Sequence, residues 1–306
     1  MGQYVAKRVF SMVITLFFVI TLTFVMMHAI PGNPFTGEKK LPPAIEKALM
    51  EKFNLDKPLS EQYVDYVSGV VRGDFGPSMK YMGRNVTDLI FDGFPVSAEL
   101  GGWAILLIVI LGIPLGVVAA LKQGTWIDRT TIFFAVLGVT IPSFVLATLL
   151  IYFFGVKYKL LPTSRWASWK SRILPTIALG ISSVAYVARL TRSSMLEVIN
   201  QDYIRTARAK GLSETVVVFK HALKNALIPV VTYLGPLAAA ILTGSFVIEK
   251  IFAVPGMGRM FVESISNRDY TVIMGVTIFY SVILVVVIFL VDLIYGFIDP
   301  RIKINK

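Results

Sequence analysis

Cysteine is absent from the 306 residues, and histidine occurs only at His28 and His221. Disulfides, thiolate metal sites and cysteine nucleophiles are therefore excluded, and two histidines cannot form a histidine-rich metal cluster. The sequence also lacks the G-x-x-x-x-G-K-[ST] pattern, whose backbone amides and lysine hold the phosphates of ATP. We expect no metal site, no catalytic residue and no ATP site in this chain.

Charged residues are scarce too. They make up 16% of the chain, against roughly a quarter in soluble domains, while 55% of the residues are apolar and the mean hydropathy is +0.70. The net charge is +11, but the basic residues interrupt long apolar stretches. This pattern indicates cytoplasmic loops beside an anionic lipid leaflet rather than nucleic-acid binding. We interpret the chain as a membrane protein.

Six apolar stretches are long enough to cross a bilayer. A spanning helix needs about 20 apolar residues, because its backbone polar groups must be satisfied within the segment. The stretches cover approximately residues 9–30, 96–121, 132–156, 173–190, 226–248 and 272–298. Apart from His28, their only ionisable residues are Glu99, Arg189 and Asp292, all near segment ends. The sequence predicts an all-α polytopic membrane protein with six transmembrane helices, without the deep ionisable groups of proton relays and ion-coupled carriers.

Segment lengths and basic residues suggest the domain organisation. Residues 1–30 would form the tail and first transmembrane helix. Residues 31–95 are too many for an ordinary loop and predict a small extracytoplasmic domain, with helices near 43–53 and 60–71. Residues 96–306 would form a five-helix core that contains a cytoplasmic loop, 191–225. Cytoplasmic termini place 14 Lys and Arg inside and 8 outside, once the long extracytoplasmic segment is set aside. We therefore expect both termini in the cytoplasm.

The cytoplasmic loop 191–225 is basic and ends in an apolar span. It is expected to hold one helix at about 194–210 and a second that continues into the fifth span. Gly211 lies between them, where a left-handed residue commonly ends a helix. On the first helix, Ile204, Ala207 and Gly211 share one side, and two of them are small enough for close approach to a partner. Two interpretations stay open: a docking element for a cytoplasmic protein, or a basic loop attracted to anionic lipid.

Several stretches resemble a known family. "RTARAKG" followed by "HALKNALIPV" is similar to the cytoplasmic loop signature of ABC-importer permeases. "LDKPLSEQY", "RGDFGPS", "VIEKIFAVPGMGRM", "RDYTVIMGV" and "DPRIK" resemble the B-type permease subunits of bacterial oligopeptide and dipeptide importers. Arg205 stands where other ABC permeases carry an acidic residue, a departure that the peptide-importer branch shares. The resemblance assigns coupling to an ATPase to a helix over 201–212, through Ile204, Arg205, Thr206, Ala207, Arg208, Lys210, Gly211 and Leu212.

The resemblance also implies partners. The complex would lie in the bacterial cell membrane, surrounded by lipid, and contain this chain, a similar C-type permease and two ATP-binding subunits of D- and F-type that hold ATP and Mg. An external peptide-binding protein would deliver oligopeptides; dipeptides or nickel are the alternatives within the family. The chain itself would not be an enzyme. Alternatives from other classes are an ATP-independent channel or secondary carrier, and a membrane scaffold.

A peptide path implies polar and aromatic groups on the spans. The candidates are Thr140, Ser143, Ser182, Ser183, Tyr186, Tyr233, Thr243 and Ser245. Serine and threonine in membrane helices also bond the backbone or a neighbouring helix, so a structural role is the alternative. The stretch Pro255, Gly256, Met257 and Gly258 predicts an external turn between the last two spans, which either covers the outer mouth or has no special role.

Overall fold

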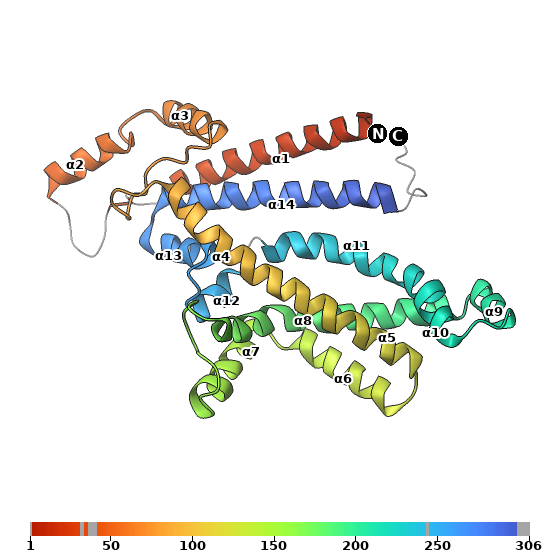
Figure 1. The fold of residues 1–306 in the computed structure, drawn as a ribbon. Coiled ribbons are helices and arrows are strands. Elements are labelled where there is room, and N and C mark those ends of the chain that lie inside the picture. Colours follow the sequence, from red (N-terminus) through yellow and green to blue (C-terminus); the bar gives the residue numbers. More distant parts are fainter. Residues whose placement is uncertain (1, 31–33, 36–41, 243–244, 299–306) are drawn as a thin grey trace. The chain divides into compact units, whose positions relative to one another are not determined.

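The computed structural model describes residues 2–30, 34–35, 42–242 and 245–298 (Figure 1). These segments are helical and contain no β-structure beyond an isolated antiparallel bridge between Pro77 and Asn85. They divide into two compact units, residues 1–97 with 255–306, and residues 98–254. The predicted all-α class is confirmed.

The first unit is built on two long helices from opposite ends of the chain. Helix α1 (Gly2–Ala29) lies beside α14 (Tyr270–Ile298), as Figure 1 shows. Helix α13 (Met257–Asn267) packs against α14, and the start of α4 (Val86–Leu107) completes the unit. The core of this unit contains Val86, Leu89, Ile90, Met257, Val272, Val276 and Tyr280.

Two short helices follow the first span, as the sequence predicts. They are α2 (Pro43–Lys52) and α3 (Leu59–Val71), close to the predicted 43–53 and 60–71. Pro42 and Pro58 precede them with φ of −54° and −55°. Proline fixes φ near the helical value, so both residues favour a helix start at the next position.

Asp269 joins the loop that follows α3 to the start of α14. Its side chain is fully buried. The carboxylate accepts hydrogen bonds from the hydroxyls of Ser78 and Thr271 and from the backbone amides of Met79 and Lys80. A buried carboxylate costs much free energy unless such donors surround it, so this residue holds the loop and the helix start in one arrangement.

The second unit is centred on α8 (Trp169–Ile199), against which α5 (Ile113–Leu121), α6 (Trp126–Thr140) and α11 (Leu223–Leu242) pack. Helix α4 continues into α5 through a π-helical segment, η1 (Ile108–Gly112). Helix α8 extends beyond the fourth span, predicted at 173–190, at both ends.

A glycine permits the close approach of α5 to α8. A Cβ atom at Gly116 would lie 2.4 Å from the carbonyl oxygen of Ala188 and 2.5 Å from Cβ of Thr191. By contrast, a Cβ atom at Gly102 of α4 would meet no other atom within 4 Å. Packing therefore requires glycine at position 116 but not at position 102.

The third predicted span is broken. Helix α6 ends at Thr140, and α7 (Ser143–Leu150) continues through a π-helical segment, η2 (Ile151–Lys157), at an angle of 103° to α6. Pro142 has no amide donor, and Ile141 before it is extended, with φ −76° and ψ 120°. The apolar stretch predicted over 132–156 is therefore two helices joined at a bend. In the described part of the chain, five helices are long and apolar enough to cross a membrane, or six if the bent pair is one crossing.

Candidate functional site

The predicted coupling helix is shorter than expected. Helix α8 continues to Ile199, and a separate helix, α9, covers Asp202–Ala209. Between them the Asn200 side-chain amide donates to the carbonyl of Leu196 at 2.8 Å, and Gln201 is extended with ψ 150°. The continuous helix predicted over 194–210 is wrong, because this side-chain bond caps α8 and the extended residue starts a new helix.

Gly211 ends α9 in the predicted conformation. Its φ is +79°, and its amide donates to the carbonyl of Arg208 at 2.9 Å. A Cβ atom there would meet no other atom within 4 Å. The backbone conformation, and not a lack of space, therefore favours glycine at this position.

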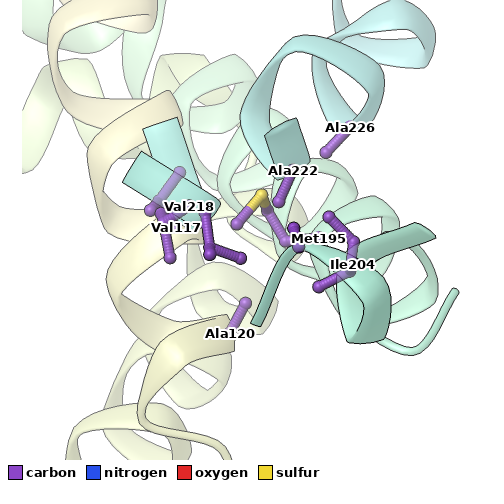
Figure 2. Close-up of a cluster of buried hydrophobic side chains, with 9 residues drawn as sticks. Val117, Ala120, Met195, Ile204, Val218, Ala222 and Ala226 are labelled. Atoms are coloured by element: carbon purple, nitrogen blue, oxygen red, sulfur yellow. The ribbon is translucent and has the colours of Figure 1, made fainter. Parts of the chain in front are cut away.

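One side of α9 is buried inside the chain. Ile204 is 0% exposed and Ala207 is 7% exposed. Figure 2 shows Ile204 beside Met195 of α8. Both belong to a cluster of buried side chains from α5, α8, α9, α11 and the π-helical segment η3 (Val217–Ala222). The cluster contains Val117, Ala120, Met195, Ile204, Ala207, Val217, Val218, Ala222 and Ala226. The prediction that the Ile204 and Ala207 side chains face a partner is wrong, because this chain already covers them.

The opposite side of α9 is exposed. The exposed residues of α9 and of the turn after it include Tyr203, Arg205, Thr206, Ala209, Lys210 and Leu212, which we name the outer face of α9. Arg205 forms an ion pair with Asp202 at 3.6 Å, with both side chains in solvent. This face combines basic groups with a small alanine and a leucine, and it is the side of α9 that the chain itself leaves uncovered.

Two side-chain contacts fix the ends of α9. The Arg208 guanidinium donates to both carboxylate oxygens of Glu214, at 2.7 and 3.3 Å, which closes the turn that contains Gly211. This hydrogen bond raises the pKa of Arg208 above its ordinary value. The Asn225 side-chain amide donates to the Tyr203 hydroxyl at 2.7 Å and ties the first turn of α9 to α11.

Three of the predicted path residues lie together in the second unit. Tyr186 of α8 and Tyr233 of α11 have ring centroids 4.3 Å apart at an interplanar angle of 32°, and Ser183 lies beside the Tyr233 hydroxyl. The guanidinium of Arg189 lies 5.6 Å from the centroid of the Tyr186 ring. The sequence interpretation noted Arg189 only as a charge near a segment end and did not connect it with the tyrosines.

The remaining path candidates are dispersed. Thr140 donates its hydroxyl to the Val136 carbonyl at 2.8 Å, and Ser245 caps α12 (Phe246–Ile251) by accepting from the Ile248 amide at 3.3 Å. In both contacts the hydroxyl bonds the backbone, which is the structural role given above as the alternative to lining a path. Ser143 begins α7 and Ser182 is half-buried in α8. Thr243 lies outside the described residues.

The predicted external turn is part of the first unit's core. Gly256, Met257 and Gly258 are buried, and only Pro255 is exposed. The Met257 amide, in the first turn of α13, donates to the Ser97 hydroxyl at 2.9 Å. A Cβ atom at Gly93 would lie 3.0 Å from that amide nitrogen. This stretch starts a packed helix, and the external turn between the last two spans stays a prediction.

Sequence reasoning missed two ion pairs in the second unit. Asp128, 3% exposed in the first turn of α6, accepts from Arg192 of α8 at 2.5 and 2.9 Å. Glu99 of α4 forms an ion pair with Arg172 at 2.6 Å and accepts from the Trp166 indole at 2.9 Å. These partners are 64 to 73 residues apart, and single sequences carry no local signal for such distant pairs. In the described residues no group of three or more His, Cys, Asp or Glu could hold a metal ion.

Comparison with known proteins places these features in a family. Residues 112–304 match the family described as binding-protein-dependent transport system inner membrane component, and residues 1–101 match the N-terminal family of such components. The two matches together cover α9, the tyrosine pair and the short helices α2 and α3.

Curated relatives match along their whole length. The chain is 55% identical over 306 residues to the dipeptide transport system permease protein DppB of Bacillus subtilis (strain 168), covering 100% of this chain and 99% of that one. It is 45% identical over 305 residues to the oligopeptide transport system permease protein OppB of Salmonella typhimurium, covering 99% and 100%. The DppB protein of Lactococcus lactis is 44% identical over 304 residues, covering 99% and 100%.

A solved structure has a similar fold. A chain of the MetNI methionine ABC transporter, described in inward-facing conformations, superposes with a TM-score of 0.53 at 18% identity, covering 69% of this chain and 96% of that one. At this identity the likeness concerns the fold alone.

Proposed function

Because the chain belongs to the binding-protein-dependent transport system inner membrane components, in their DppB- and OppB-like branch, we propose that it is the membrane subunit through which an ATP-driven importer takes up peptides. A similar C-type permease would complete the path, two ATP-binding subunits of D- and F-type would supply the energy, and an external binding protein would deliver the peptide. Both termini lie in the cytoplasm in this proposal.

The packing of α9 carries the proposal. Its outer face is free for an ATP-binding subunit, while Ile204 and Ala207 on the other side are held by α5, α8, η3 and α11. A displacement of α9 therefore moves the ends of several spans together instead of bending a loose loop. The ATP-binding subunits and the loaded binding protein must each favour a different arrangement of these spans, since a ligand shifts only an equilibrium in which it binds the two states unequally.

The substrate class is peptide, and dipeptides are the first length to test. The sequence motifs favoured oligopeptides, whereas a dipeptide permease is 55% identical and an oligopeptide permease 45% identical. The second dipeptide permease, at 44%, is as distant as the oligopeptide permease. Identity thus supports peptides as a class and a graded series of lengths as the assay.

Mutations can separate the contributions of shape and of charge to the function of the outer face of α9. Ala209→Trp adds bulk without changing charge, so it should abolish binding-protein-stimulated ATP hydrolysis in the assembled complex if this face fits a partner. Thr215→Trp is the matched control, since Thr215 is exposed on the neighbouring α10 (Glu214–Val216). Both variants should insert normally and still recruit the loaded binding protein.

The lipid interpretation predicts the reverse. Attraction to anionic lipid is about 1 kcal/mol per basic residue whatever the shape of the surface. Near-normal stimulated hydrolysis in Ala209→Trp, together with severe loss when Arg205 and Lys210 are changed to Gln, would reject docking in favour of lipid binding. A channel or secondary carrier predicts peptide uptake by this chain without any ATP-binding partner.

A further inference from the structure

Arg189 is an exposed cation within a membrane helix. It lies on α8, which covers Trp169–Ile199, and the ion pairs of the described residues do not include it. Arg192, one turn further along, pairs with Asp128 in the first turn of α6. In the proposed topology this pair is closer to the cytoplasm than Arg189, so Arg189 lies on the membrane side of it.

The side chain is directed away from the cytoplasmic end. Its guanidinium lies over the ring of Tyr186, three residues earlier, at 5.6 Å, and that ring packs on Tyr233 at 4.3 Å. Side chains in helices lean toward the N-terminus, which allows this contact. Arginines that only avoid lipid extend toward the nearer membrane surface instead, which for this helix is its C-terminal end.

An exposed arginine in this position needs water or a polar partner. Contact of a charged side chain with lipid is costly, so arginines within membrane helices face a bundle interior or a water-filled path. The ring beneath the guanidinium belongs to Tyr186, which stacks on Tyr233, and the Tyr233 hydroxyl lies beside Ser183. A guanidinium with hydroxyl donors beside it is suited to bind a carboxylate, often through two parallel hydrogen bonds.

We propose that Arg189, with the Tyr186 and Tyr233 pair, is a binding site on the translocation path for the C-terminal carboxylate of the passing peptide. This inference rests on the proposed function, since it names the chemical group recognised on that path. The two aromatic rings supply an apolar wall beside the cation, a combination typical of ligand sites with few convergent polar groups. An acidic residue of the partner permease is the competing occupant, and the experiment separates the two.

The test uses the complete complex in proteoliposomes, with saturating binding protein loaded with one peptide or with its C-terminal amide. Loading of both ligands is verified beforehand by direct binding. Wild-type complex should import the free acid at least about tenfold faster, which corresponds to about 1.4 kcal/mol. Arg189→Gln should lower uptake of the acid to the level of the amide and leave the amide unchanged. Arg189→Lys should restore part of the preference, because lysine keeps the charge but not the planar fork.

Arg129→Gln is the matched control, since Arg129 is an exposed arginine on α6. It should retain the acid preference. Equal loss of acid and amide uptake in Arg189→Gln overturns the inference, as does failure of that variant to copurify with the second permease, which would assign Arg189 to an intersubunit ion pair. A wild-type complex that imports neither ligand instead overturns the proposed function itself.

Discussion

Ile204→Ala tests whether packing inside the chain holds α9 in place. The Ile204 side chain is 0% exposed and contacts the cluster that joins α9 to the spans. Truncating a fully buried isoleucine costs about 2–5 kcal/mol, because apolar contacts are lost and a cavity remains. Helix α9 has only 8 residues, and isolated helices shorter than about 12 residues are marginal in water. We expect the loss to open α9 locally while the spans stay folded.

Amide hydrogen exchange of the purified complex measures this opening. The amides of Ile204, Arg205 and Lys210 donate to backbone carbonyls in or next to α9, so they exchange only when the helix opens. At the lower limit of about 2 kcal/mol, the open population rises roughly 30-fold, and exchange in this segment accelerates by the same factor. Peptide-stimulated ATP hydrolysis should fall in parallel, because an opened helix cannot transmit movement.

Thr206→Ala is the control, because Thr206 is exposed on the same helix. Its exchange should stay near that of the wild type. If Ile204→Ala also exchanges at the wild-type rate, the buried cluster does not hold α9, and the proposed transmission through it is wrong. Faster exchange across all spans would instead indicate global unfolding and would equally contradict local anchoring.

Three further experiments test the packing, an ion pair and the topology. Gly116→Ala should lower the thermal stability of the complex by about 1–3 kcal/mol, because its Cβ overlaps the backbone of α8, whereas Gly102→Ala should be neutral or slightly stabilising; equal effects would contradict the close approach. Asp128→Asn should lower the free energy of unfolding by on the order of 3 kcal/mol, and also replacing its arginine partner should restore part of that stability; losses that simply add would show that the two residues do not interact. In the naturally cysteine-free chain, Met82→Cys, at a position 94% exposed, should react with an impermeant maleimide from outside, and Ser213→Cys only after permeabilisation; the reverse pattern inverts the topology.

Local features could be predicted from the sequence. The apolar stretches predicted the candidate spanning helices, and Gly211 predicted the left-handed end of α9. Both predictions rest on properties of the segment itself, namely its hydrophobic length and its backbone freedom. The two short helices α2 and α3 could be predicted for the same reason. These parts of the fold need no knowledge of distant contacts.

Features that depend on tertiary contacts could not be predicted. Pro142 marks the break in the third span, yet Pro175, Pro229 and Pro236 lie inside unbroken helices. A proline alone therefore does not indicate a break, since neighbouring groups can satisfy the carbonyl it leaves free. The apolar side of α9 posed a similar problem: small apolar residues suit contact with a partner and contact within the chain equally well, and only the fold shows that Ile204 is covered.

The bonds to Asp269 also bear on the order in which the chain assembles during synthesis. The Ser78 hydroxyl and the Asp269 carboxylate are 191 residues apart, and at about 5–20 residues per second the first waits roughly 10–40 s for the second to be made. Helix α1 likewise waits for α14. Residues 98–254 form one continuous unit, whose internal contacts need no residue made after Val254. The nascent chain therefore passes through a stage in which this unit can be complete before α14, the partner of α1, has been made.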